Sequence, residues 1–310
     1  MAKIGFLGAG STVFAKNVLG DCLHVPALRD AEISLVDIDA DRLHVSETML
    51  RNVNRTLGAQ ADIHAYLAED ADEALRDADY VINAIQVGGY EPATVTDFEI
   101  PKKYGLRQTI GDTLGIGGIF RALRTIPVML DYARIMERVA PDVLLLNYAN
   151  PMAMLTGALL KATGVRTVGL CHSVQVCALH LCSELDLPTD DLQWRIAGIN
   201  HQGWLLEITR HGEDLYPEIK RRAELPEYKR RDAVRFELMK WFGHYVTESS
   251  EHTAEYVPWF IKAEHPELIE QFHIPLDEYP RRCIAQIEGW AKMRDELLAD
   301  KPIDHTRTQE

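Results

Sequence analysis

The stretch KIGFLGAGSTV at residues 3–13 decides the fold of this chain. Its first five residues form an apolar run of strand length, and Gly8 and Gly10 follow before a helical pattern that continues to about Leu23. Gly8 permits a tight turn, and Gly10 lets a pyrophosphate approach the start of the helix, where N–H groups and the helix dipole favour negative charge. The stretch therefore indicates either a dinucleotide site, with Ser11 beside the phosphates, or an ordinary strand-to-helix turn.

A second apolar run, Glu32 to Asp37, ends in an acid and favours the dinucleotide site. An acid at the end of this strand can bind the ribose 2′-hydroxyl and repels a 2′-phosphate, so Asp37 points to NAD rather than NADP. Asp39 is a second candidate for the ribose contact. The third glycine of the usual fingerprint is replaced by Val13, which leaves the motif incomplete.

Strand-length apolar runs alternate with helical patterns over the first part of the chain, which predicts a doubly wound parallel sheet of the Rossmann type in an α/β fold. Further runs lie at residues 79–85, 143–148 and 166–171, and a helical pattern lies at 119–139. Two more strands are predicted at 193–199 and 204–209, before a charged, aromatic-rich helical region. We therefore predict an NAD-binding domain over residues 1–190 and a mixed α+β substrate and metal domain over residues 191–310, the architecture of lactate and malate dehydrogenases.

The charge balance excludes some classes of partner. Lys and Arg number 33 against 47 Asp and Glu, a formal charge of −14, which disfavours nucleic acid and anionic membrane surfaces. No segment approaches the ~18 consecutive apolar residues that a membrane span needs. Five cysteines without a CxxC pair, and an N-terminus without the pattern of a signal peptide, favour a cytoplasmic protein.

Three polar segments follow predicted strands, where open α/β sheets place their ligands. They are NYANPM (147–152), CHS (171–173) and GINHQ (198–202). Cys171 and His201 offer a thiolate and an imidazole, which suit a borderline divalent metal. A small core cysteine and a hydrogen-bonded turn histidine are the alternative interpretation.

Two further segments carry titratable groups. GDTLGIGG (111–118) places Asp112 in a glycine-rich loop before a helix with Arg121 and Arg124. TESSEHTAEYVPW (247–259) sets polar side chains beside aromatic ones, as in the wall of a sugar-sized pocket. A surface loop and a solvated helix start are the simpler interpretations of these two segments.

Taken together, these motifs resemble glycoside hydrolase family 4, the NAD- and metal-dependent glycosidases, and specifically its melibiase-like α-galactosidases. The matching stretches are GAGS (8–11), GDTLGIGGIFRALRTIP (111–127), LNYANPMAM (146–154), GLCHSVQ (169–175), AGINHQGW (197–204), VTESSEHTAEYVPWFIK (246–262) and IPLDEYPRRC (274–283). They occur in order over almost the whole chain. Family members generally continue further, so the resemblance implies a C-terminally shortened fold, and it also implies a homo-oligomer.

The resemblance implies a redox-assisted mechanism rather than the two-carboxylate scheme of most glycosidases. NAD takes hydride from the sugar C3, and a divalent metal, commonly Mn²⁺, holds the C2 and C3 oxygens and acidifies the C2 proton. A base removes that proton and the aglycone leaves from C1. Water then adds, and the retained NADH returns its hydride.

By motif match, the resemblance assigns roles to particular residues. Cys171 and His201 would be the metal ligands, and Asn150 would contact the sugar hydroxyls. Asp112 matches the acid that raises the basicity of the catalytic tyrosine, for which Tyr256 is the candidate.

The general acid and the remaining substrate contacts stay open. His172 stands where some phospho-glycosidase members have Asp, so it is expected either to assist the leaving group or to bind substrate. Glu248 and His252 are alternatives for acid chemistry and for substrate contacts. Arg282, next to Arg281, would either form a basic rim for a phosphorylated sugar or cap a helix.

Galactose is favoured by the resemblance alone, and glucose, galacturonate and phosphorylated sugars remain alternatives. Two other functions are open. One is a 2-hydroxyacid dehydrogenase of the lactate/malate type, which shares the nucleotide half and an Asn-Pro turn. The other is an inactive NAD-binding remnant that folds through residues 1–190.

Overall fold

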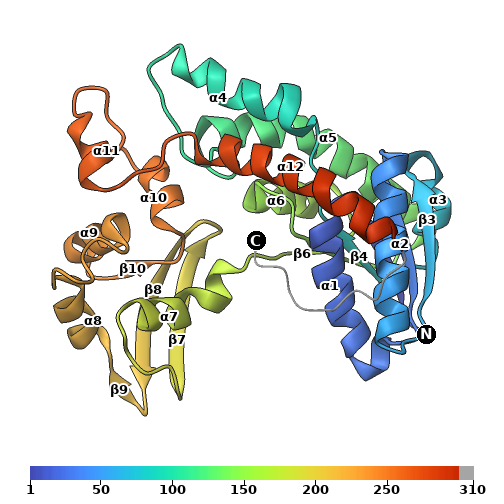
Figure 1. The fold of residues 1–310 in the computed structure, drawn as a ribbon, viewed down its shortest axis with the longest axis horizontal. Coiled ribbons are helices and arrows are strands. Elements are labelled where there is room, and N and C mark those ends of the chain that lie inside the picture. Colours follow the sequence, from blue (N-terminus) through green and yellow to red (C-terminus); the bar gives the residue numbers. More distant parts are fainter. Residues whose placement is uncertain (300–310) are drawn as a thin grey trace. The chain divides into compact units, whose positions relative to one another are not determined.

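β1 (Lys3–Leu7) lies inside a six-stranded sheet in the computed structural model, which describes residues 1–299 (Figure 1). The other strands are β2 (Glu32–Asp37), β3 (Asp62–Leu67), β4 (Tyr80–Asn83), β5 (Leu144–Asn147) and β6 (Arg166–Gly169). Their order is β3-β2-β1-β4-β5-β6, and every pairing is parallel. This is the strand order of the doubly wound dinucleotide-binding fold, so the predicted Rossmann-type sheet is confirmed.

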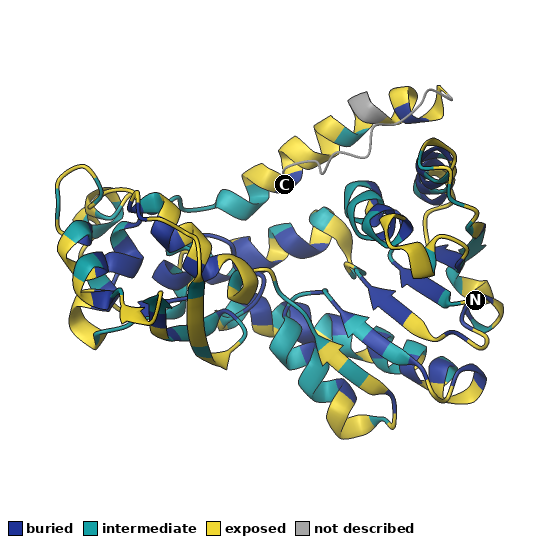
Figure 2. Ribbon diagram, turned by 90° about the horizontal axis from the view of Figure 1, so that it is seen from below, coloured by how far each residue is buried: buried dark blue, intermediate teal, exposed yellow. Residues whose placement is uncertain are grey.

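Helices cover both faces of this sheet and bury it. They are α1 (Thr12–His24), α2 (Ala40–Thr56), α3 (Ala71–Ala74), α5 (Gly115–Val139) and α6 (Met152–Ala162), with short 3₁₀ turns at Pro26–Leu28 and Ala68–Asp70. Successive strand residues point to opposite faces, so Phe6 packs with Leu19 of α1 and Leu50 of α2, whereas Leu7 packs in the cluster of Met129 of α5. The inner strands β1, β2 and β4 are mostly buried in consequence, whereas edge strand β6 has no fully buried residue (Figure 2).

The seven predicted strands are present, with ends that shift by at most two residues. β3 was not predicted. It is an edge strand of sequence DIHAYL, and only Ile63 of it is buried. A half-buried edge strand does not need a continuous apolar run, and therefore gives a weak sequence signal.

A second, antiparallel sheet follows, which confirms the mixed α+β character predicted for the second part. Its strands are β7 (Leu192–Ile199), β8 (Gln202–Arg210), β9 (Glu213–Asp214) and β10 (Tyr245–Val246), in the order β10-β8-β7 with β9 paired to β8. The helices around it are α7 (Ser173–Glu184), α8 (Tyr216–Ala223), α9 (Ala233–Phe242), α10 (Ser250–Tyr256) and α11 (Glu267–Gln271). Earlier in the chain lie the π-helical turn η3 (Gly89–Thr94) and α4 (Val95–Lys102), and α12 (Glu278–Leu298) comes last.

The compact units of the structure divide the chain differently from a single boundary near residue 190. Of the described residues, the first unit comprises 1–87, 122–170 and 283–299, and the second comprises 88–121 and 171–282. α7 belongs to the second unit because Cys177 and Leu181 pack with Leu205 of β8. The functional labels of the two predicted domains stay predictions, and residues 300–310 lie outside the described part of the chain. None of the helices described is both long and apolar enough to cross a membrane.

Candidate active site

The tight pairing of β7 with β8 places His201 at the tip of a hairpin. Ile199 pairs with Gln202, so Asn200 and His201 form a two-residue turn. His201 has a φ of +64°, a left-handed conformation that is uncommon for a residue other than glycine, and its side chain is buried. Unusual backbone conformations of this kind concentrate at functional sites.

Cys171, which lies between β6 and α7, approaches this histidine. Its Sγ is 3.5 Å from His201 Nε2 and 3.5 Å from Ser173 Oγ. Ser173 Oγ donates a hydrogen bond to Glu248 Oε2 (2.6 Å), and the same carboxylate oxygen is 3.3 Å from His201 Nε2. A thiol, an imidazole and a carboxylate therefore offer three ligand atoms within 4.8 Å of one another.

Hydrogen bonding inside this group favours its charged forms. Burial raises the pKa of the Cys171 thiol, but its hydrogen bonds with His201 and Ser173 outweigh burial and leave that pKa lowered. Burial likewise disfavours protonated His201, but its contacts with Cys171 and Glu248 leave its pKa raised. The thiolate, which is the form of cysteine that binds metals, is thus stabilised by its neighbours.

Asp112 is held in a loop packed tightly against the first turn of α5. A Cβ at Gly117 would lie 2.3 Å from the carbonyl oxygen of Gly111, and a Cβ at Gly118 would lie 2.5 Å from that of Thr113, so only glycine fits at either position. Asp112 is buried and accepts a hydrogen bond from Thr113 Oγ1 (2.7 Å). This close packing fixes the direction of the Asp112 carboxylate.

Buried Arg121 provides the opposite charge for this carboxylate. Burial raises the pKa of Asp112, but the Arg121 guanidinium and His252 outweigh it and leave the pKa lowered. Arg121 in turn donates to the hydroxyl of Tyr279 at 3.3 Å. Asp112 therefore remains an anion inside the protein.

α10 brings two further side chains to His201. The hydroxyl of Tyr256 lies 3.4 Å from His201 Nδ1, and the ring of His252 packs edge-on against His201 with centroids 4.8 Å apart. Burial, and next the negative charge of Asp112, raise the pKa of Tyr256 well above its ordinary value. Burial lowers the pKa of His252, which favours its neutral form.

Six of the predicted residues thus gather in the second unit. The six are Cys171, His201, Asp112, Tyr256, Glu248 and His252. His172 is exposed at the start of α7. Arg282 is exposed and pairs with Glu278 one turn earlier in α12 (2.8 Å), which decides neither of its two predicted roles.

Asn150 lies in the first unit, in the polar turn after β5. Buried Asn147 holds this turn: its Oδ1 accepts hydrogen bonds from Asn83 Nδ2 (2.9 Å) and from the N–H of Ala149 (3.1 Å). Its Nδ2 donates to Thr156 Oγ1 at 3.1 Å. The position of Asn150 is thus set by Asn147.

Some residues of the second unit received no role from the sequence. Ser173 and Arg121 lie in the motif stretches, but their hydroxyl and guanidinium groups contact other segments of the chain. Such contacts follow no fixed spacing along the sequence, so no motif reveals them. Glu255, next to Tyr256, is a third such residue: its carboxylate accepts hydrogen bonds from backbone N–H groups of the loop before Asp112.

The turn after β1 has the features of a dinucleotide site. Gly8 has a φ of +84°, and the N–H of Gly10 donates to Asp37 Oδ2 (2.6 Å). Ser11 is exposed at the start of α1, and its side chain makes no capping hydrogen bond there. Asp39 caps α2 by accepting from the N–H of Arg42 (3.0 Å), and its own N–H donates to Asp37 Oδ1 (3.0 Å), so both ribose candidates hold the backbone of this turn.

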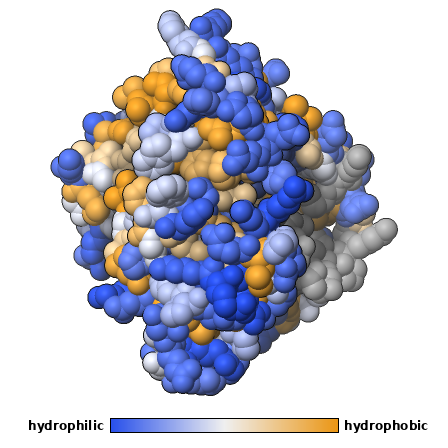
Figure 3. Space-filling view, turned by 90° about the vertical axis from the view of Figure 1, so that its left-hand side faces the viewer, coloured by the Kyte–Doolittle hydropathy of each residue, from blue (hydrophilic) through white to orange (hydrophobic). Residues whose placement is uncertain are grey.

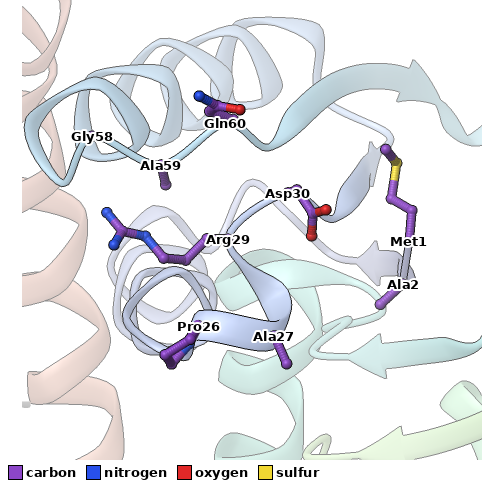
Figure 4. Close-up of a pocket in the computed structure, with 9 residues that line it drawn as sticks. All are labelled: Met1, Ala2, Pro26, Ala27, Arg29, Asp30, Gly58, Ala59 and Gln60. Carbon is purple, nitrogen blue, oxygen red and sulfur yellow. The ribbon is translucent and has the colours of Figure 1, made fainter.

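Two cavities lie away from these groups. One of about 540 Å³ is lined by residues that precede β1, β2 and β3, including Ala2, Asp30 and Gln60 (Figure 4). It therefore lies at the amino ends of the strands, whereas open α/β sheets bind ligands at the carboxyl ends. A second cavity of about 430 Å³, in the second unit, is walled by aromatic side chains such as Trp241 and Phe272.

Figure 3 shows hydrophobic patches interrupted by hydrophilic side chains on one face of the molecule.

Family comparison agrees with this combination of a nucleotide-binding turn and a thiol–imidazole–carboxylate cluster. The model of the family 4 glycosyl hydrolases matches residues 3–187, and the model of the family 4 C-terminal domain matches residues 196–310. The chain therefore belongs to glycosyl hydrolase family 4.

Individual relatives are similar over most of the chain. An α-galactosidase of Bacillus subtilis (strain 168) is 60% identical over 311 residues, which cover 100% of this chain and 72% of that protein. An α-galactosidase of Rhizobium meliloti (strain 1021) is 38% identical over 84% of this chain and 53% of its own length.

Solved structures share the fold. The crystal structure of a Bacillus subtilis protein assigned as a glucosidase has a TM-score of 0.83 at 25% identity, covering 99% of this chain and 74% of that one. A 6-phospho-α-glucosidase from gut microorganisms, in complex with NAD and Mn²⁺, has a TM-score of 0.72 at 21% identity, with coverage of 99% and 71%. A malate dehydrogenase from Picrophilus torridus has a TM-score of 0.53 at 14% identity, covering 96% of this chain and 98% of that one, which confirms the predicted dehydrogenase-like architecture.

Proposed function

We propose that this chain cleaves α-galactosides, with NAD and a divalent cation such as Mn²⁺ as cofactors. The observation that carries the proposal is the convergence of Cys171, His201 and Glu248 beside Tyr256 and Asp112. The choice of galactose is supported by the 60% identity with the Bacillus subtilis α-galactosidase.

The donor set of the second unit fits a divalent cation. Cys171 Sγ, a ring nitrogen of His201 and a carboxylate oxygen of Glu248 combine a soft, a borderline and a hard ligand, which suits a first-row metal. Three protein ligands leave coordination positions for two sugar oxygens. Asp112, His201 and His252 form a second group of donors within 4.8 Å, but Arg121 already compensates the charge of Asp112. We therefore assign the cation to the first group.

The turn of the first unit fits NAD. A Cβ at Gly10 would lie 2.9 Å from Asp37 Oδ2. The backbone of the turn is therefore accessible to a ligand only because residue 10 is a glycine. The free N-terminus of α1 favours a pyrophosphate, and the Asp37 carboxylate at the end of β2 favours a ribose hydroxyl. When bound, NAD and the cation supply hydride exchange with the sugar and polarisation of its oxygens.

The remaining chemistry falls to the side chains of this chain. Tyr256 would remove the C2 proton as the phenolate, after its own phenolic proton has left to solvent. Burial, and next the Asp112 anion, raise the pKa of this phenol, which makes the phenolate a strong base once formed, and the positive charge of a bound cation would favour its formation. Asn150, on its turn after β5, would orient the sugar hydroxyls. His172 is our candidate for the leaving-group acid, because burial lowers the pKa of His252 and favours its neutral form.

Hydrolysis of an aryl α-galactoside tests the proposal directly. We expect turnover that requires NAD, Mn²⁺ and a reductant that keeps Cys171 reduced, and that disappears after thorough chelation and returns with Mn²⁺. Turnover that persists without metal would refute the metal assignment. Cys171→Ser should lose most activity and bind Mn²⁺ more weakly in calorimetry, whereas Cys283→Ser, in which the altered thiol lies outside the cluster, is the matched control.

A substrate panel and isotope effects test the finer parts. Aryl α-glucoside, α-galacturonide and 6-phospho-α-glucoside should be cleaved more slowly than the galactoside, and malate should not be oxidised. Substrate deuterated at C2 or C3 should react more slowly if hydride and proton transfer limit the rate. The same samples, weighed by native mass spectrometry, test the expected homo-oligomer.

A further inference from the structure

Glu255 is a carboxylate of the second unit that the proposed chemistry does not use. It lies on α10, directly before Tyr256, and is half-buried. Its side chain makes no contact with Cys171 or His201 in the hydrogen-bond network described above. Removing an acid from water costs folding free energy. A role for Glu255 would account for that cost.

Three consecutive backbone N–H groups converge on this carboxylate. Oε2 accepts from the N–H of Thr109 (2.7 Å) and of Ile110 (3.2 Å), and Oε1 accepts from the N–H of Gly111 (2.8 Å). A fourth bond joins the same segments, because Thr109 Oγ1 donates to the backbone carbonyl of Glu251 (2.7 Å). The segment 109–111 is therefore fastened to α10 mainly through one side chain.

The two fastened segments each lead into a residue of the proposed chemistry. Gly111 is followed at once by Asp112, and Glu255 is followed at once by Tyr256. We propose that Glu255 is a positioning residue, which holds the segment 109–111, and with it the Asp112 carboxylate, in a fixed place relative to the Tyr256 hydroxyl. This inference rests on the proposed function for its catalytic consequence, but not for its structural part.

Only an ionised carboxylate suits this arrangement. It offers acceptor sites on both oxygens and no donor, which matches three convergent N–H groups. The amide of a glutamine would turn its NH₂ toward at least one of these donors. Burial, opposed by the hydrogen bonds from Gly111 and Thr109, raises the pKa of Glu255 to about 7, and the negative charge of Asp112 acts in the same direction. An ionised Glu255 therefore costs folding free energy at this buried position, but it accepts all three backbone hydrogen bonds, which a glutamine amide does not do.

The test compares Glu255→Gln with Glu251→Gln. Both variants change one glutamate of α10 to the amide, but the Glu251 side chain takes no part in fastening the loop, whose bond there goes to the backbone carbonyl. Hydrogen exchange read by mass spectrometry reports the amides of residues 109–111 without any need for activity. We expect these amides to exchange at least tenfold faster in Glu255→Gln than in wild type at pH 8, and at the wild-type rate in Glu251→Gln.

The catalytic consequence is read from steady-state kinetics with an aryl α-galactoside. Small misplacements of catalytic groups cost up to about a hundredfold in rate. We expect kcat of Glu255→Gln to fall about tenfold to a hundredfold with KM changed by less than about threefold, because both oxygens of Glu255 are engaged by backbone amides. In wild type, kcat should also fall as the pH drops through about 7, and this limb should be absent from Glu255→Gln.

The outcomes separate this inference from the proposed function. Unchanged exchange at residues 109–111 in Glu255→Gln, or a kcat within twofold of wild type, would overturn the positioning role. Wild-type protein that cleaves no α-galactoside would overturn the proposed function, while the exchange measurement would still decide whether Glu255 holds the loop. If Glu255→Gln does not fold, Glu255→Asp shortens the same anchor by one methylene and should give intermediate exchange and intermediate kcat.

Discussion

The glycines at the start of α5 give the sharpest test of how the Asp112 loop is held. In Gly117→Ala, the new Cβ would lie 2.3 Å from the Gly111 carbonyl oxygen and 2.8 Å from Gln108 Oε1. Real Cβ atoms do not approach closer than about 3.0 Å, so the backbone of Gly111 must retreat by at least about 0.7 Å. Overpacking of this kind costs about 1–3 kcal/mol, which for a chain of 310 residues corresponds to a fall in Tm of about 1.5–5 °C.

The same displacement moves Asp112, which follows Gly111 directly. A shift approaching 1 Å at a catalytic group can cost about a hundredfold in rate, so kcat should fall at least tenfold. Thermal unfolding and aryl α-galactoside hydrolysis are the assays. Gly157→Ala in α6 is the matched control, since nothing lies within 4 Å of the new Cβ; the substitution should raise helix stability by about 0.5–1 kcal/mol and leave kcat unchanged. If Gly117→Ala keeps both its Tm and its kcat, the tight packing of the loop on α5 is wrong.

Three further variants test other parts of the structure. Asp232→Asn removes the partner of buried Arg235 (2.6 Å) and should destabilise the protein by about 3–5 kcal/mol, measured by denaturant unfolding; a loss under 1 kcal/mol would argue against this pair. Gly10→Ala places a Cβ 2.9 Å from Asp37 Oδ2 and should weaken NAD binding about tenfold or more in calorimetry, which unchanged affinity would contradict. For Glu255, the folded pKa of about 7 exceeds the ordinary 4.5, so the folded protein favours the protonated acid: that stabilisation is full below pH 4.5 and is lost as the pH rises through 7, where the carboxylate that holds the loop forms at a cost in stability. The stability of Glu255→Gln relative to wild type should therefore increase between pH 5 and 8, by on the order of 3 kcal/mol, and a difference that does not vary with pH would refute the shift.

The first unit was predictable because its signals are local. A strand, a glycine turn, a helix and a second strand ending in acid occur within residues 3–37, and they fix one βαβ unit whose extension gives the whole sheet. β3 escaped because His64 and Tyr66 interrupt its apolar pattern at the sheet edge. The compact units differ from the predicted boundary near residue 190 for another reason. Packing of α7 on β8 is a tertiary contact, which the order of elements along the chain does not reveal.

The site was predictable only in part, because its residues meet through long-range contacts. Cys171 and His201 are thirty positions apart, and it is the segment before α7 and the tip of the β7–β8 hairpin that bring them to 3.5 Å. Glu255 acts on backbone N–H groups, which every sequence has, so no motif marks its target. The contact of Arg282 is the opposite case, since its partner Glu278 lies four positions earlier in the same helix.

The second unit keeps several buried charges whose partners are all internal. Asp112 is compensated by Arg121, the carboxylate of Glu248 lies beside His201, and Glu255 is held by three amides. Apolar side chains of similar size would often give equal or greater stability at such positions, so stability alone does not account for so many ionisable groups in one place. Because each group shifts the pKa of its neighbours, a change at one of them alters the protonation of the others. That coupling suits a site that must hold a cation and move a proton within the same few ångströms.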